Sequence, residues 1–200
     1  FDVTSEAAVA DGLKATRAAF GHVDILVNNA GEAPSAPFEK TSLDMWNHVL
    51  AVDLTGAFLV TQAVLPDLKS RGDGARIINV ASTAGLTGYA YVSAYTAAKH
   101  GVIGLTRSLA LEFAKTGITV NAVCPGFTDT PLIAQAIETI VAKTGRSRED
   151  AMKEFTKSNP QGRLIRPEEV ADAVLWLASP AAASINGQAI AIAGGEVLAG

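Results

Sequence analysis

Three side chains in the segment 81–99 have the types and spacing needed for proton transfer to a carbonyl oxygen. Ser82 closely follows the apolar run Arg76–Val80, so its hydroxyl is expected at the carboxyl end of a strand, where open α/β sheets bind their ligands. Tyr95 and Lys99 lie four residues apart in an Ala-rich segment, so one helical turn places them on the same face, about 6 Å apart. We therefore expect the serine, the tyrosine and the lysine to converge on one point.

The lysine is expected to tune the tyrosine. A free tyrosine has a pKa of about 10 and holds its proton too tightly for efficient exchange near neutral pH. The Lys99 ammonium favours the phenolate, which predicts a lowered pKa for Tyr95 and lets this residue act as an acid in one direction and a base in the other. Ser82 would hold the substrate oxygen by a hydrogen bond. Because no side chain can carry a hydride, the arrangement implies a nicotinamide cofactor.

Four motifs occur in register along the chain, and together they resemble a known family. They are Asn28-Asn29-Ala30-Gly31, Ser82, Tyr95-Thr-Ala-Ala-Lys99 and Asn121-Ala-Val-Cys-Pro125-Gly126. With these motifs the chain resembles a short-chain dehydrogenase/reductase of the single-domain oxidoreductase type over essentially all of its residues. The resemblance implies an α/β fold with a doubly wound, Rossmann-like parallel sheet, and one domain that spans residues 1–200.

The same resemblance implies NAD or NADP as cofactor and leaves the choice between them open. It places the adenine end of the cofactor at Asp2 and Val3, the ribose and nicotinamide half at the Asn28 turn, and the nicotinamide carboxamide at the Pro125 turn. It gives Asn29 a mainly structural role. The residues assigned to the cofactor are Asp2, Val3, Asn28, Ala30, Gly31, Val52, Tyr95, Lys99, Pro125, Gly126 and Thr128. Simpler readings remain open, since Asp2 suits a helix start and asparagines favour turns.

Asp53 departs from the family pattern. The segment Val52–Gly56 stands where the resemblance expects Val-Asn-Leu-x-Gly, so Asp53 occupies the position of a fourth catalytic residue that is normally an asparagine. In the family that residue helps to hold a water molecule beside the lysine, largely through its backbone carbonyl, which an aspartate also offers. The alternative is a buried aspartate that caps a kink in a helix.

Alternating strands and helices must position these groups. The sequence predicts a helix that is capped at Thr4 or Ser5 and ends at Gly21, and a long helix from Ser42 to about Leu68. A third helix carries Tyr95 and Lys99, and a fourth begins at Pro167. Short apolar or β-branched runs predict strands at 24–28, 76–80, 118–124 and 189–193. Residues 127–161 carry two helical patterns and are expected to form a substrate lid, or else an ordinary surface hairpin.

Composition narrows the class of partner. A net charge of −4 without a basic block argues against nucleic acid or an anionic membrane surface, and we find no uninterrupted apolar run long enough to span a membrane. The single cysteine, Cys124, fits a cytoplasmic protein. The three histidines are scattered, so metal binding is not expected. Small residues on the Tyr95 helix, together with the resemblance, suggest a homo-oligomer, either a dimer or a tetramer.

The start of the chain differs from the family pattern. It opens on Phe1 rather than Met, and the family's Gly-rich dinucleotide turn is not among these residues. The resemblance therefore suggests that roughly the first quarter of the natural protein lies upstream. Without those strands, the remaining sheet is expected to expose an apolar edge.

Taken together, the residues and the resemblance predict an NAD(P)-dependent oxidoreductase that interconverts a secondary alcohol and a ketone. The run 116–131 most resembles enzymes acting on 3-hydroxyacyl or 3-oxoacyl thioesters and short hydroxy acids. One alternative is a polyol or cyclic alcohol dehydrogenase. Another is a catalytically silent subunit that binds nucleotide.

Overall fold

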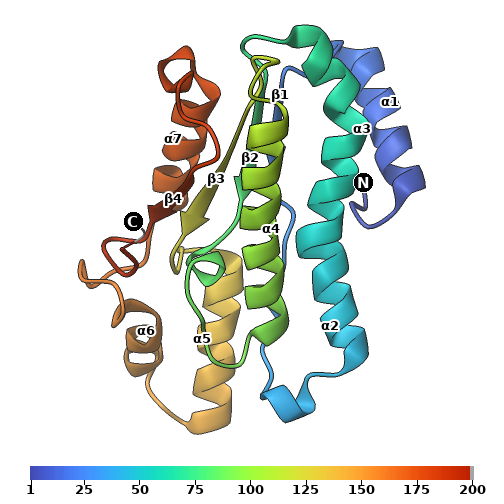
Figure 1. The fold of residues 1–200 in the computed structure, drawn as a ribbon. Coiled ribbons are helices and arrows are strands. Elements are labelled where there is room, and N and C mark those ends of the chain that lie inside the picture. The colour runs from blue at the N-terminus through green and yellow to red at the C-terminus, as the bar shows by residue number, and fades with distance from the viewer. Residues whose placement is uncertain (199–200) are drawn as a thin grey trace.

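The computed structural model describes residues 1–198 and arranges them as a parallel β-sheet with helices on both faces (Figure 1). The strands lie side by side in chain order: β1 (Ile25–Asn28), β2 (Arg76–Val80), β3 (Thr119–Pro125) and β4 (Ala189–Ile192). All three neighbouring pairs are parallel. The predicted α/β fold is confirmed, and the carboxyl ends of the strands meet at one edge of the sheet.

Strand β1 forms one lateral edge of this sheet. Its residues Ile25 and Val27 are exposed, whereas Leu26, which points to the other face, is buried. The sequence predicts such an exposed apolar edge, because an apolar strand that has only one neighbouring strand leaves part of its surface uncovered.

One face of the sheet is covered by α3 (Gly56–Arg71) and α4 (Ser93–Glu112), and α1 (Glu6–Phe20) packs on the outside of α3. The predicted start of α1 is correct, because the Ser5 hydroxyl accepts a hydrogen bond from the Ala8 N–H. The helix ends at Gly21, whose φ of 83° suits a residue without a side chain.

A π-helical turn interrupts the long helix that the sequence predicts from Ser42. This helix comprises α2 (Leu43–Leu50), the π turn (Ala51–Thr55) and α3, and its axis continues without a break (Figure 1). A π turn holds one extra residue and therefore changes the direction of the side chains it carries. Asp53 lies in this turn and is buried.

By length and composition, the combined helix 43–71 is able to cross a membrane, and it is the one such helix found among residues 1–198. Polar residues are scattered along this helix, so it contains no long uninterrupted apolar run. It packs against α1, α4 and β1, and it buries Val49, Asp53 and Val60. These are the contacts of a core helix in this fold.

The other face of the sheet is covered by α7 (Pro167–Ala178), which begins at Pro167 as predicted. Between β3 and α7 the chain forms α5 (Pro131–Thr144) and α6 (Arg148–Thr156), which pack against each other at the carboxyl end of the sheet (Figure 1). This excursion is closed at its base: Ile165 donates its N–H to the Phe127 carbonyl at 2.9 Å, and Asp129 donates to the Ile165 carbonyl at 2.8 Å. Single 3₁₀ turns occupy Phe38–Lys40, Thr83–Gly85 and Pro180–Ala182.

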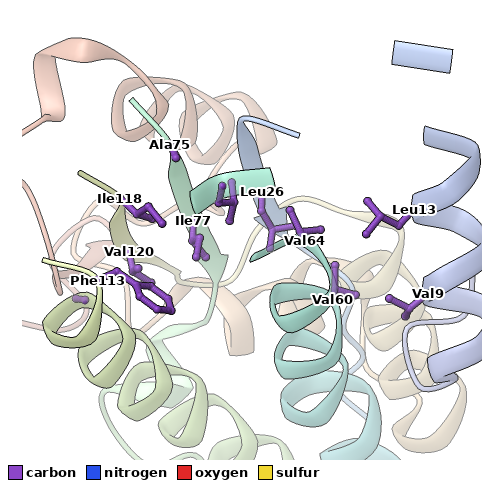
Figure 2. Packing of buried hydrophobic residues seen from close by; sticks show 12 residues of the cluster. Val9, Leu13, Leu26, Val60, Val64, Ala75, Ile77, Phe113, Ile118 and Val120 are labelled. Carbon is purple, nitrogen blue, oxygen red and sulfur yellow. The ribbon is translucent and has the colours of Figure 1, made fainter. Parts of the chain in front are cut away.

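The largest apolar cluster lies between the sheet and the helices α1, α3 and α4 (Figure 2). Alternation along β2 divides the core, because Ile77 belongs to this cluster and Ile78 packs toward Leu177 of α7. Each fully buried aliphatic side chain contributes about 1.5–3 kcal/mol. The cluster contains Val9, Leu13, Leu26, Val60, Val64, Leu68, Ala75, Ile77, Ala110, Phe113, Ile118 and Val120.

Candidate active site

The structure brings Ser82, Tyr95 and Lys99 together at the carboxyl end of β2. Ser82 comes two residues after the strand and its Oγ accepts a hydrogen bond from the Ala84 N–H at 3.1 Å, which fixes the serine at the start of a 3₁₀ turn. The Ser82 hydroxyl lies close enough to the Tyr95 hydroxyl to influence its pKa. Lys99 lies one turn further along α4, with its Nζ 5.4 Å from the centre of the Tyr95 ring.

Backbone and side-chain groups hold the Lys99 ammonium at two points. Its Nζ donates a hydrogen bond to the Val80 carbonyl at 3.1 Å and lies 3.1 Å from Asp53 Oδ1. The backbone carbonyl of Val80, at the end of the strand that leads to Ser82, therefore also holds the Lys99 ammonium. An ammonium has three N–H donors, so one remains for a further acceptor.

Asp53 enters the site through its side chain rather than only through its backbone. Its carboxylate forms the ion pair with Lys99 and accepts hydrogen bonds from the Glu32 N–H, at 3.3 Å to each oxygen. The alternative of a helix-capping aspartate is wrong, because the carboxylate points away from its own helix toward these partners. Burial raises the pKa of Asp53, and the Lys99 ammonium opposes this shift.

The pKa of Tyr95 moves in the direction opposite to the predicted one. Burial of the ring raises it, the Ser82 hydroxyl opposes this, and Asp53 and Cys124 raise it further. The sequence predicts a lowered pKa because it shows Lys99 one turn away. It does not show that the ring is buried, which is the main cause of the rise, or that a carboxylate from another helix lies beside the ammonium. Tyr95 therefore holds its proton tightly in this structure.

A cavity of about 210 Å³ opens beside Lys99 and Asp53. Val3, Asn28 and Ala30, which the resemblance assigns to the cofactor, contribute to its lining. A second cavity of about 530 Å³ lies toward α7 and is lined in part by Pro125 and Thr128. The two cavities share Val27, Asn29 and Val80, so they meet at the carboxyl ends of β1 and β2.

Several residues assigned to the cofactor do not line either cavity. The Asp2 carboxylate is exposed and accepts hydrogen bonds from the N–H and hydroxyl of Thr4, at 2.8 and 2.7 Å, as expected for an aspartate just before a helix. Val52 belongs to the π turn and Gly126 lies against Glu196. Gly31 lets the backbone come close to Asp53 and Lys99, since a Cβ at this position would lie 2.7 Å from Asp53 Oδ1 and 3.3 Å from Lys99 Nζ.

Both asparagines at the end of β1 line the first cavity, and Asn28 makes structural hydrogen bonds in addition. The Asn28 amide donates to Thr61 Oγ1 at 3.0 Å and to Asn79 Oδ1 at 2.8 Å, which are structural contacts in the core. Asn79 continues this chain of hydrogen bonds to Thr106 at 2.8 Å. Asn29, to which the resemblance gives the structural role, lines both cavities.

A polar and aromatic cluster beside the Pro125 turn is missed by sequence reasoning. The Tyr89 hydroxyl donates to Glu196 Oε1 at 2.7 Å and contacts Thr83 Oγ1 at 2.9 Å, and burial helps to raise the pKa of Tyr89 to about 12. The Tyr89 ring packs edge-on against Phe127 at 5.8 Å, and Phe127 against Phe155 of α6 at 5.2 Å. No local signal reveals this cluster, because its members are far apart in the sequence.

Comparisons with known proteins agree with this geometry. A family model described as "Enoyl-(Acyl carrier protein) reductase" matches residues 1–196. The chain is 41% identical over 197 residues to a D-beta-hydroxybutyrate dehydrogenase of Cupriavidus necator, covering 98% of this chain and 76% of the relative. It is 44% identical over 195 residues to a cis-4-hydroxycyclohexanecarboxylate dehydrogenase of Sinomonas cyclohexanicum, covering 97% and 74%. A crystal structure of an actinorhodin polyketide ketoreductase with NADPH superposes with a TM-score of 0.91 at 41% identity, covering 98% and 75%.

Proposed function

Because this chain belongs to the short-chain dehydrogenase/reductase family and is an NAD(P)-dependent oxidoreductase that interconverts a secondary alcohol and a ketone, we propose that Ser82, Tyr95 and Lys99 are its catalytic residues. The observation that carries this proposal is their convergence at the carboxyl end of β2, where Lys99 also lines the cavity beside Asp53. This is the edge of a parallel sheet at which α/β proteins bind their ligands.

In the proposed mechanism, Tyr95 moves the proton. In the direction of reduction its hydroxyl donates a proton to the ketone oxygen, and in the direction of oxidation its phenolate accepts the proton of the alcohol. The Ser82 hydroxyl lies near the Tyr95 hydroxyl, so it is placed to hold the same substrate oxygen. NAD(P), when bound, supplies or accepts the hydride.

The residues around the two cavities fit part of such a cofactor. Lys99 has an N–H donor left for a ribose hydroxyl, and Val3 and Ala30 offer an apolar wall beside it. Pro125 and Thr128 lie on the turn after β3, where the second cavity begins. Asn29 is added to the proposed contacts because it lines both cavities, while Asp2, Val52 and Gly126 rest on the family resemblance alone.

We propose a 3-hydroxyacyl or 3-oxoacyl thioester, or a short 3-hydroxy acid, as the substrate. Support comes from the hydroxybutyrate dehydrogenase and the ketoreductase among the relatives. The cyclohexanecarboxylate enzyme is the observation that favours the second candidate, a cyclic alcohol. The intact trio of serine, tyrosine and lysine argues against a catalytically silent subunit.

We further propose that residues 127–161 form a substrate lid within one domain spanning residues 1–200. The helices α5 and α6 stand at the carboxyl end of the sheet, and Phe155 of α6 connects them to Tyr89 through Phe127. We also propose that the protein is cytoplasmic and forms a homo-oligomer, either a dimer or a tetramer.

The test is a spectrophotometric screen of the full-length natural protein. NAD and NADP are each offered with 3-hydroxybutyrate, a 3-hydroxybutyryl thioester, a sugar alcohol and a cyclohexanol carboxylate. Turnover of the hydroxyacyl compounds above the others supports the substrate proposal, and preference for the cyclic alcohol selects the second candidate. Absence of turnover with all four, in protein that still binds nucleotide, would instead favour the silent subunit.

A further inference from the structure

The carboxylate of Asp53 stands inside the proposed proton-transfer site, where the family resemblance expects a neutral asparagine. Its side chain is 0% exposed, and that of its partner Lys99 is 5% exposed. The two charges are 3.1 Å apart. In such a poorly solvated position each charge strongly affects its neighbours, because little water screens them.

The surrounding backbone is shaped around this ion pair. The π turn directs Asp53 toward Lys99, and the Val80 carbonyl holds the ammonium from the other side at 3.1 Å. Gly31 leaves the necessary space, since a Cβ would lie 2.7 Å from the carboxylate oxygen. The Glu32 N–H donates to both carboxylate oxygens. Asp53 is therefore held in place by two other segments of the chain, the loop that contains Gly31 and Glu32, and Lys99 of α4.

The charge of Asp53 changes what Lys99 does to Tyr95. An asparagine could accept similar hydrogen bonds, but it would leave the ammonium with an uncompensated positive charge beside the phenol. With Asp53 present, the pair is neutral, and the attraction between the ammonium and a phenolate is opposed by the carboxylate. In agreement with this, burial first and the Asp53 charge in addition raise the pKa of Tyr95.

Other titratable groups near the site do not replace this effect. Glu32, on the loop after β1, pairs with His48 of α2 at 2.6 Å and acts on Asp53 as a like charge. Cys124 of β3 also raises the pKa of Tyr95, less than burial and Asp53 do, and Asp53→Asn leaves this contribution in place. Burial raises the pKa of the Cys124 thiol itself to about 11, so it is neutral near pH 7.

We propose that Asp53 is a positioning residue that offsets the charge of Lys99 and keeps Tyr95 protonated, so that alcohol oxidation requires a higher pH than it would with an asparagine. The inference rests on the proposed roles of Tyr95 and Lys99. It assigns the Asp53 side chain a task that the backbone carbonyl at this position does not perform.

The test is Asp53→Asn in the full-length natural protein, with kcat/KM for oxidation of 3-hydroxybutyrate measured against pH. We expect the rising limb of the profile to move to lower pH, so that oxidation at neutral pH increases severalfold, because Lys99 then stabilises the phenolate without opposition. An unchanged profile, or a shift to higher pH, would overturn the proposal.

Asp67→Asn is the matched control. Asp67 is also a buried aspartate of the same long helix and is paired with Arg17, at 2.9 Å, away from the site. This substitution is expected to reduce stability and to leave the pH profile in place. If Asp67→Asn shifted the profile as much as Asp53→Asn does, the effect would be a general one of lost stability, and the proposal would be wrong.

A second measurement separates this inference from the proposed function. The tyrosinate absorbance of each protein is titrated, and the Tyr95→Phe difference isolates Tyr95 without any substrate. A lower titration midpoint in Asp53→Asn supports the inference even if no tested alcohol is turned over, and an equal or higher midpoint refutes it even in an active enzyme. If Asp53→Asn does not fold, Asp53→Ser keeps an acceptor for the Glu32 N–H and gives the same test.

Discussion

The Tyr95 hydroxyl is the group whose removal tests the proposed chemistry most directly. Tyr95→Phe deletes the transferable proton and leaves the ring and its packing. We expect turnover to fall by about 10²–10⁴-fold, the usual contribution of a general acid or base. Steady-state rates, combined with a fluorescence titration of the nucleotide, should show loss of turnover with binding retained.

Tyr91→Phe is the matched control for that substitution. Tyr91 lies four residues earlier, on a loop, and is 66% exposed. Its removal should leave turnover unchanged. A Tyr95→Phe enzyme that remained within a few-fold of the unmodified protein would mean that another group moves the proton.

Gly31 tests the close packing around the ion pair. In Gly31→Ala the new Cβ would lie within 2.7 Å of Asp53 Oδ1, so the carboxylate must move away from Lys99. We expect a loss of about 1–3 kcal/mol in the free energy of unfolding, as for other overpacked sites, together with reduced turnover. Chemical denaturation and rate measurements check this. Gly88→Ala is the control, because a Cβ there meets nothing within 4 Å and both values should stay unchanged.

At the level of single residues, the sequence predicts Ser82, Tyr95 and Lys99 as the catalytic trio, because their types and spacing are visible in one short segment. It does not predict that the Asp53 side chain reaches Lys99. That contact depends on the π turn and on the packing of α2 and this turn against α4, and neither leaves a recognisable local pattern. The predicted direction of the Tyr95 pKa is wrong mainly because the ring is buried, and the Asp53 carboxylate adds to that effect.

Among the secondary-structure elements, Asp67 joins α3 to α1 and to the loop before β1. Its carboxylate accepts hydrogen bonds from the Arg17 guanidinium and from the Val23 N–H, and it contacts His22. The hydrogen bonds from Arg17 hold the pKa of Asp67 well below its usual range. The folded state therefore favours the ionised carboxylate.

Asp67→Asn should lower the free energy of unfolding at neutral pH by about 1–2 kcal/mol, a modest value because Arg17 is partly solvated. Since the folded pKa is depressed, the contribution is complete above the unfolded pKa of about 3.9 and declines as the pH falls below it. Urea denaturation of both proteins at neutral pH and at about pH 3 checks this. An equal difference at both values would show that the ionised form is not the source of the stability.

Element boundaries follow closely from local signals. Ser5 and Ser42 cap the helices that they are predicted to cap, and the four strands lie where the apolar runs predict them. The π turn within the long helix is not predicted, since Ala51–Thr55 contains neither proline nor glycine. The turn packs against α4, a contact between segments far apart in the sequence.

At the scale of the whole molecule, the proposed lid is connected to the sheet through aromatic contacts. Phe155→Ala removes the edge-on contact with Phe127, which is worth about 0.5–1.5 kcal/mol. We expect KM for the thioester to rise by about threefold to tenfold with a smaller change in kcat, because the proton-transfer groups are untouched. Phe20→Ala, at the exposed end of α1, is the control and should change neither constant. A fall in kcat alone would place Phe155 in the chemical step and not in the lid.

The short backbone bridge between Phe127, Asp129 and Ile165 joins the two ends of the segment 130–164. Because the chain leaves and re-enters the rest of the fold at this one bridge, a change in the length or sequence of the segment is expected to leave the strands and the positions of Ser82, Tyr95 and Lys99 unaltered.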